Sequence, residues 1–162
     1  MVNRTLIFFV LALSLIVEVL IFAPPFVSVE WRYALMVGFA PFCHQIPSRS
    51  FAIDGTSLAV CHRCLGVYTG ILITIAGAVF LGGLAWARRV DFFGRARWYL
   101  LAVLVPLGID WYGGYSGLWS SSPASRLITG LLFGGVAGML LTIAVSKAGL
   151  TSPDSERAVI PS

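Results

Sequence analysis

The sequence has few charged residues, and this scarcity excludes whole classes of protein. Aspartate, glutamate, lysine and arginine make up 11% of the 162 residues, whereas hydrophobic residues make up 58%. Soluble domains carry about 25% charged residues, and a chain this short could not hide so much apolar surface from water. Intrinsic disorder is excluded as well, because it requires low hydrophobicity and high charge. With a mean hydropathy of +0.90, the sequence predicts a protein whose solvent is lipid.

Cysteine and histidine are also scarce, with three and two residues. An odd number of cysteines cannot be fully paired within one chain. The net charge of +4 would suit a nucleic-acid partner, but four of the eleven cations stand in one short stretch between apolar segments: Arg88, Arg89, Arg95 and Arg97. Such a cluster is typical of a cytoplasmic loop. We therefore expect a lipid bilayer as the partner, and no nucleic acid.

Four apolar segments are long enough to cross a bilayer, whose hydrocarbon core needs about 20 helical residues. They are residues 5–23, 65–86, 98–117 and 127–145. The third fits least well, because Pro106, Gly108 and Asp110 interrupt it. The expected fold class is all-α, a membrane bundle of four transmembrane helices. It would form a single domain over residues 1–150, followed by a polar, disordered tail over residues 151–162.

The first span has the charged start of a signal peptide, with Arg4 before an apolar stretch. Glu18 interrupts that stretch, however, and Pro24 would block cleavage, so we expect the span to be retained as an anchor. Together with Arg4 and Lys147, the arginine cluster predicts that both termini of a multi-pass cell-membrane protein are cytoplasmic. The segment over residues 24–64 would then face outward.

Part of this outer segment, residues 27–42, is apolar but too short to span, which predicts an interfacial or re-entrant helix between the first two spans. Gly66 and Gly70 begin the second span, and Gly130 and Gly134 begin the fourth. Small residues four positions apart permit close approach of two membrane helices, although glycine is also common in such helices generally.

The residues that carry chemistry stand in the outer segment. Cys61 and Cys64 have the spacing at which two thiolates grip one zinc ion through a tight turn. Cys43 and one histidine would complete a set of three cysteines and one histidine. Adjacent residues of an extended chain point in opposite directions, so His62 competes with His44 for the fourth place. The predicted metal ligands are Cys43, His44, Cys61 and Cys64, with His62 as the alternative.

Other interpretations of the cysteines stay open. In an oxidising outer compartment, Cys61 and Cys64 could cycle as a disulfide, the plan of four-helix membrane thiol oxidases. Those enzymes usually need a second cysteine pair, and this chain has only Cys43 in addition. A structural disulfide and unligated thiols are the remaining alternatives. A c-type haem site is excluded, because Leu65 and not histidine follows Cys64.

Two blocks of the sequence form specific motifs. The first runs from Cys43 to Phe51 and continues with Gly55, Cys61, Arg63, Cys64, Gly66, Tyr68 and Gly70; the second comprises Pro106 to Asp110, Ser121, Ser122, Arg126, Thr129, Gly130 and Gly134. In both blocks, over roughly residues 43–134, the sequence resembles the DUF2085 family of small predicted membrane proteins. That family continues Asp-Gly-x-x-Gln where this chain has Asp110-Trp-Tyr-Gly-Gly, so an expected polar group is missing. The resemblance implies no established activity, and it supports the site without naming a reaction.

Two acids, Glu18 and Asp110, fall within predicted spans. An isolated charge at such a depth costs at least about 2.5–3.5 kcal/mol, so each should face protein or water and have a partner. For Glu18 the simplest arrangement is a neutral carboxyl hydrogen-bonded within the bundle. For Asp110 we expect Arg126, at the outer end of the fourth span, as the partner, in a structural or a functional pair.

These observations favour a metal-binding membrane protein with zinc as its cofactor. In an enzyme of this kind the metal would activate water or polarise a lipid-borne group, with Asp110 as base and Arg126 as a second catalytic candidate. Thr129 and Glu18 are the further candidates for their pocket. The alternatives are a thiol–disulfide oxidoreductase that passes electrons to a membrane quinone, and a small transporter or scaffold. The sequence is compatible with a homo-oligomer and leaves the substrate, a small molecule or a lipid, unspecified.

Overall fold

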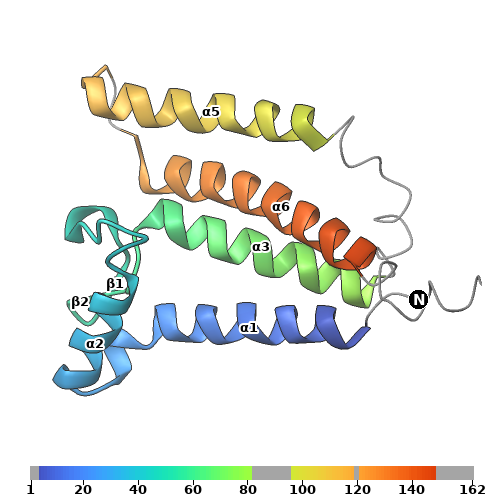
Figure 1. Cartoon of the computed structure of the whole chain (residues 1–162). Coiled ribbons are helices and arrows are strands. Elements are labelled where there is room, and N and C mark those ends of the chain that lie inside the picture. Colours follow the sequence, from blue (N-terminus) through green and yellow to red (C-terminus); the bar gives the residue numbers. More distant parts are fainter. Residues whose placement is uncertain (1–3, 82–95, 119–120, 149–162) are drawn as a thin grey trace, which may run out of the picture.

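Four long helices lie side by side in the computed structural model, which describes residues 4–81, 96–118 and 121–148. They are α1 (Arg4–Phe22), α3 (His62–Phe80), α5 (Ala96–Ser116) and α6 (Pro123–Ala148). Helix α3 packs between α1 and α6, and α5 packs on the other side of α6 (Figure 1). The all-α expectation is confirmed for the described residues, apart from one short hairpin.

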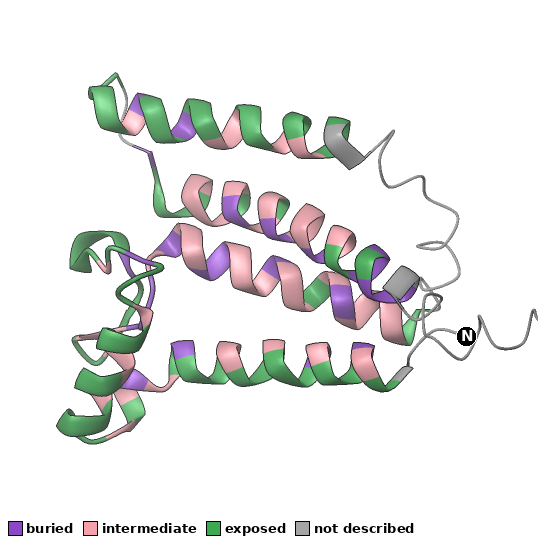
Figure 2. Ribbon diagram, viewed as in Figure 1, coloured by how far each residue is buried: buried purple, intermediate pink, exposed green. Residues whose placement is uncertain are grey.

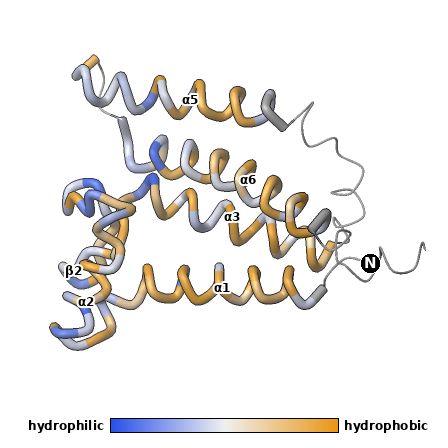
Figure 3. The backbone as a smooth tube through the Cα atoms, in the orientation of Figure 1, coloured by the Kyte–Doolittle hydropathy of each residue, from blue (hydrophilic) through white to orange (hydrophobic). Residues whose placement is uncertain are grey.

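Three of these helices are long and apolar enough to cross a membrane, over Thr5–Phe22, His62–Phe80 and Pro123–Ser146. The side of α1 that faces away from α3 is largely exposed in Figure 2, whereas α3 and α6, which lie between other helices, are mostly intermediate or buried; all three helices are largely apolar in Figure 3. An exposed apolar side such as that of α1 is the pattern of a lipid-facing surface. The segment predicted as the third span is helical, as α5, but it is not among the candidate spans. Its interior Pro106 and its polar and aromatic end make it less apolar than the other three helices.

Helices α3 and α6 approach each other along a line of glycines that belong to the two motifs noted in the sequence. A Cβ atom at Gly70 would lie 2.5 Å from the carbonyl oxygen of Leu131, and one at Gly138 would lie 3.0 Å from Ile71 Cα. Cβ atoms at Gly66 and Gly134 would also collide with backbone of the facing helix. The two glycine motifs therefore form one helix–helix interface. Their glycines have a packing role and are not present only because glycine is common in membrane helices.

Local signals set the ends of these helices. Pro24 follows α1 and begins a 3-10 turn, η1 (Pro24–Phe26). Helix α6 begins with Pro123 at its first position, and the Ser122 hydroxyl accepts a hydrogen bond of 3.0 Å from the Ser125 backbone N–H. This is the usual N-terminal capping arrangement. At the end of α5, Gly117 has a φ of +72°, the left-handed conformation that commonly terminates a helix.

The chain between α1 and α3 lies at one end of the helices, where α3 and α6 begin (Figure 1); we call this the cysteine end. It contains α2 (Val29–Phe39), a 3-10 turn η2 (Pro47–Arg49) and two antiparallel strands, β1 (Ala52–Ile53) and β2 (Thr56–Ser57). Asp54 and Gly55, both with positive φ, form the two-residue turn of this hairpin. Helix α2 has no buried residue and lies beyond the end of α1.

The connecting segment is nevertheless anchored to the bundle. Its core comprises Ile21, Cys43, Leu58, Ala59, Val60 and Leu65. The Ala59 backbone N–H donates to the Ile21 carbonyl over 3.1 Å. Gln45 donates from Nε2 to the carbonyls of Met36 and Ala59, at 2.7 and 2.8 Å, and so ties α2 to the stretch before α3. Cys43 is thereby held near the start of α3.

Two predictions concern residues outside the described ranges. Arg88, Arg89 and Arg95 of the arginine cluster, on which the expected orientation depends, lie outside these ranges, and so does the tail over residues 151–162, which is expected to be disordered. Both expectations stay predictions.

Candidate metal centre

The three cysteine sulfurs come together at the cysteine end. The Sγ atoms of Cys43, Cys61 and Cys64 all lie within 4.8 Å of one another. Cys61 is the N-cap residue of α3, Cys64 lies in the first turn of that helix, and buried Cys43 arrives from the end of α2. All three are free thiols, and the three sulfurs are close enough together to hold one metal ion.

Local hydrogen bonds favour this arrangement of sulfurs. The Cys61 backbone N–H donates to Cys43 Sγ over 3.2 Å, which holds the two residues together. Hydrogen bonds from the neighbouring Cys43 and Cys64 thiols lower the pKa of Cys61 below its ordinary value. Three thiolates this close repel one another, so full ionisation of the cluster requires a cation.

The two histidines are placed differently from the cysteines. Neither belongs to the group of ligand atoms that lie within 4.8 Å of one another. His62 is buried, with its ring 4.3 Å from the Phe51 ring in an edge-on contact, and its Nδ1 has no hydrogen-bond partner. His44 is exposed and lines the cavity beside the sulfurs.

That cavity, which we call the thiol cavity, has a volume of about 280 Å³. The three cysteines share its wall with His44 and with aromatic and basic side chains, among them Arg49, Arg63, Trp111 and Arg126. The cluster is therefore open on one side, toward a space that is polar on part of its wall.

A second cavity of about 150 Å³ contains Asp110, and we call it the arginine pocket. Arg49, Arg63, Trp111 and Arg126 line both cavities, so the two spaces are adjacent. Asp110, from α5, is almost fully buried.

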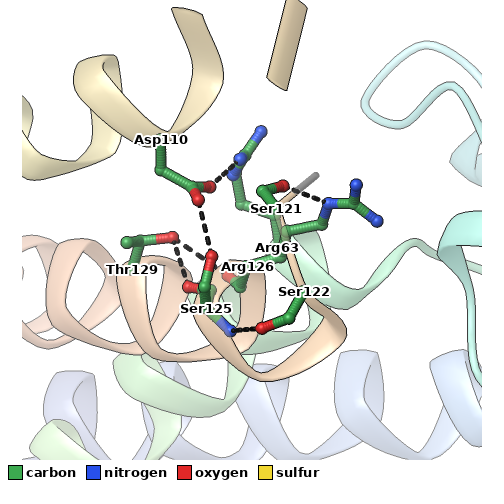
Figure 4. Close-up of polar contacts among 7 residues, drawn as sticks. All are labelled: Arg63, Asp110, Ser121, Ser122, Ser125, Arg126 and Thr129. Atoms are coloured by element: carbon green, nitrogen blue, oxygen red, sulfur yellow. Dashed lines mark hydrogen bonds and ion pairs between the residues drawn. The ribbon is translucent and has the colours of Figure 1, made fainter. Parts of the chain in front are cut away.

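The partner of Asp110 differs from the one that the sequence predicts. Asp110 Oδ2 forms an ion pair with Arg63, and Oδ1 accepts a hydrogen bond of 2.5 Å from the Ser125 hydroxyl (Figure 4). Arg126 donates from Nε to Ser121 Oγ over 2.7 Å. The expected Asp110–Arg126 ion pair is therefore wrong. The glycine interface explains the outcome, because it seats the first turn of α3, with Arg63, directly against α6.

The other predicted pocket residues lie elsewhere. Thr129 donates to carbonyls of its own helix, those of Ser125 and Arg126 (Figure 4). Glu18 faces α3, where Thr69 Oγ1 donates to its Oε1 over 2.6 Å. The expectation that Glu18 has a partner inside the bundle is confirmed, but neither Glu18 nor Thr129 lines the thiol cavity or the arginine pocket.

Comparison with known proteins agrees with the placement of the site. The family described as "Predicted membrane protein (DUF2085)" matches residues 43–140, a range that begins at the first cysteine and includes all three. The chain belongs to the DUF2085 family. No solved structure matches it.

Two archaeal relatives of this DUF2085 protein are described as uncharacterised proteins. One, from Methanocaldococcus jannaschii, is 36% identical over 107 residues, which cover 64% of this chain and 65% of the relative. The other, from Methanothermobacter thermautotrophicus, is 31% identical over 93 residues, which cover 57% of this chain and 78% of the relative. The chain thus spans just under two thirds of the length of the first relative.

Proposed function

We propose that this chain is a metal-binding protein of the cell membrane in which Cys43, Cys61 and Cys64 bind zinc. The observation that carries the proposal is the gathering of the three sulfurs within 4.8 Å of one another. In tetrahedral sites with Zn–S bonds of about 2.3 Å, sulfurs lie about 3.8 Å apart, so only a small adjustment is needed. Two ligands on one helical turn and a third held by Gln45 give such a site a rigid frame.

The fourth ligand position decides between a structural and a catalytic ion. His44, on the wall of the thiol cavity, is the protein ligand that we propose for a closed site. Without it, the position would open to that cavity, and bound zinc would lower the pKa of a water molecule or polarise a carbonyl or phosphoryl oxygen. Asp110 is poorly suited to act as base, because both of its oxygens are engaged, by Arg63 and Ser125. We assign it the positioning of Arg63.

For the membrane arrangement we propose a single domain over residues 1–150 with both termini in the cytoplasm. The concentration of arginines in residues 88–97 supports this orientation. The cysteine end would then face outward, where incoming metal meets the site without crossing the membrane.

Metal analysis of the purified protein tests the proposal. We expect close to one zinc per chain, and loss of most of it in Cys43→Ser, Cys61→Ser and Cys64→Ser alike, because a half-built site binds metal poorly. Ser48→Ala, an exposed change in the same segment, is the matched control and should retain zinc. His44→Asn distinguishes the two kinds of site: loss of affinity assigns the fourth ligand, and full retention indicates an open position. A metal-free wild type that stays metal-free after zinc is supplied contradicts the proposal.

A second candidate function is thiol–disulfide exchange by Cys61 and Cys64. The observation in its favour is their position at the N-terminus of α3, where a helix dipole and neighbouring donors stabilise a thiolate. A thiol count before and after mild oxidation distinguishes it from metal binding. Loss of two thiols, restored by reduction and independent of zinc, would favour exchange.

A further inference from the structure

Three arginines from different parts of the chain converge on the arginine pocket. Arg49 comes from η2, Arg63 from the first turn of α3, and Arg126 from the first turn of α6. Figure 4 shows the guanidinium groups of Arg63 and Arg126 on the same side of the helices as Asp110. These residues are far apart in sequence, so the fold itself assembles the cluster.

The pocket carries an excess of positive charge. Asp110 is the single acid among its lining residues, and Arg63 neutralises it. Within the described ranges, neither Arg49 nor Arg126 has an ion-pair partner. Arg126 uses Nε for its hydrogen bond to Ser121, and its two terminal nitrogens have no hydrogen-bond partner among the residues described. Two cationic side chains therefore remain to bind a ligand of opposite charge.

We propose that the arginine pocket binds a phosphate group, as a free phosphate or as the headgroup of an anionic lipid. Planar guanidinium groups match the oxygens of phosphate in two-pronged hydrogen bonds. The volume of about 150 Å³ is that of about five water molecules, which suits a group of five heavy atoms. This site goes beyond the proposed metal centre and does not depend on it, because all of its cations belong to the protein.

The surroundings of the pocket suit the polar boundary of a membrane. The pocket lies where candidate spans α3 and α6 begin. The end of a spanning helix is the level at which lipid headgroups would lie. Its wall includes Trp111 and Tyr115, whose rings stack with centroids 5.5 Å apart. Tryptophan and tyrosine are enriched at that boundary. The adjacent thiol cavity would place a bound phosphate beside the cysteine cluster.

Isothermal titration of the purified full chain in an uncharged detergent tests this site. The probes are inorganic phosphate and dihexanoyl phosphatidylglycerol. We expect at least one of them to bind, and we expect Arg49→Gln and Arg126→Gln each to raise its Kd at least tenfold. Arg32→Gln is the matched control, because Arg32 lies at the same end of the molecule, contacts the Pro24 carbonyl and lines neither cavity. It should leave the Kd unchanged.

The two probes distinguish the source of the phosphate. Arginine-dependent binding of inorganic phosphate indicates a soluble ligand, and binding of the lipid alone indicates a headgroup. Exposed Arg49 contributes little to folding, so its variant stays informative even where Arg126→Gln is unstable. Binding of neither probe overturns the proposal, as does an equal loss in Arg32→Gln. Cys64→Ser should keep the affinity; if it loses the phosphate, the ligand belongs to the cysteine cluster and the arginine pocket is excluded.

Discussion

Arg63 and Asp110 join helices α3 and α5, which are separated by α6, through one ion pair at the cysteine end. Ser125, on α6, donates to the same carboxylate, so three helices meet at Asp110. Arg63 stands between Cys61 and Cys64 in sequence. The ion pair therefore fixes the first turn of α3, which carries two of the three clustered thiols, relative to the rest of the bundle.

The first prediction concerns this ion pair. Asp110→Asn and Arg63→Gln each leave an opposite charge unpaired in a buried site, which costs roughly 3–5 kcal/mol when burial is complete. The cost should be lower here, because 23% of the Arg63 side chain is exposed. The double variant should lose clearly less than the sum of the two single losses.

Denaturation of these variants in detergent measures the coupling. Asp110→Asn combined with Arg126→Gln serves as the matched comparison, and its losses should add, because Arg126 contacts Ser121 and not Asp110. The structure would be contradicted if the stability losses of Asp110→Asn and Arg63→Gln simply added, whereas those of Asp110→Asn and Arg126→Gln did not.

The second prediction concerns the glycine interface. Gly134→Ala places a methyl group against the Val67 backbone, so helices α3 and α6 must separate. Overpacking of this kind typically costs about 1–3 kcal/mol. Gly77→Ala is the matched control, because it lies in α3 with nothing within 4 Å of the added atom. It should be neutral or stabilise by up to about 1 kcal/mol through helix propensity. Equal thermal stability of the two variants would mean that the interface is looser than described.

Much of this architecture could be predicted from the sequence. Hydropathy located both ends of α1 and α6 to within four residues and the start of α3 to within three, because hydropathy is a local feature. Glycine spacing indicated that membrane helices could approach closely, and the structure shows that α3 and α6 are the two helices concerned. The Cys-x-x-Cys spacing also predicted two adjacent sulfurs, and the structure brings Cys43 to them.

The partners across the helices could not be predicted in the same way. Which cation reaches Asp110 depends on how α3 is rotated against α6 and on how closely the two helices pack. The spacing of residues along the sequence determines neither of these. Arg63 stood out in the sequence only as a cation within the cysteine motif. Gln45, with a φ of +49°, anchors Cys43 through two carbonyls that lie 9 and 14 residues away, and no motif signals such contacts.

The third prediction concerns the acid inside the first span. Glu18→Ala removes the acceptor for the Thr69 hydroxyl and leaves it unsatisfied between α1 and α3, at a cost of about 1–3 kcal/mol. Glu18→Gln keeps an acceptor oxygen at that position and should retain most of the stability. Thermal unfolding in detergent measures both, with Thr69→Val as the variant that removes the other partner. If Glu18→Ala and Thr69→Val are additive, the hydrogen bond contributes nothing to folding.

The fourth prediction concerns orientation. All three cysteines lie at one end of the bundle, so a membrane-impermeant thiol reagent reports which side that end faces. When the reagent is applied to intact cells after chelation of metal, it should label the wild type. The arginines at 88–97 indicate that their loop is cytoplasmic, so the cysteine end, at the other end of the helices, should face outward.

The variant with all three cysteines changed to serine should stay unlabelled. Adding Ser155→Cys to that variant provides the matched reporter for the C-terminal tail, and it should react only after the cells are opened. The reverse pattern of labelling would place the cysteine end in the cytoplasm. Because the cytoplasm is reducing, that result would argue against disulfide exchange and would favour metal binding as the role of the three thiols.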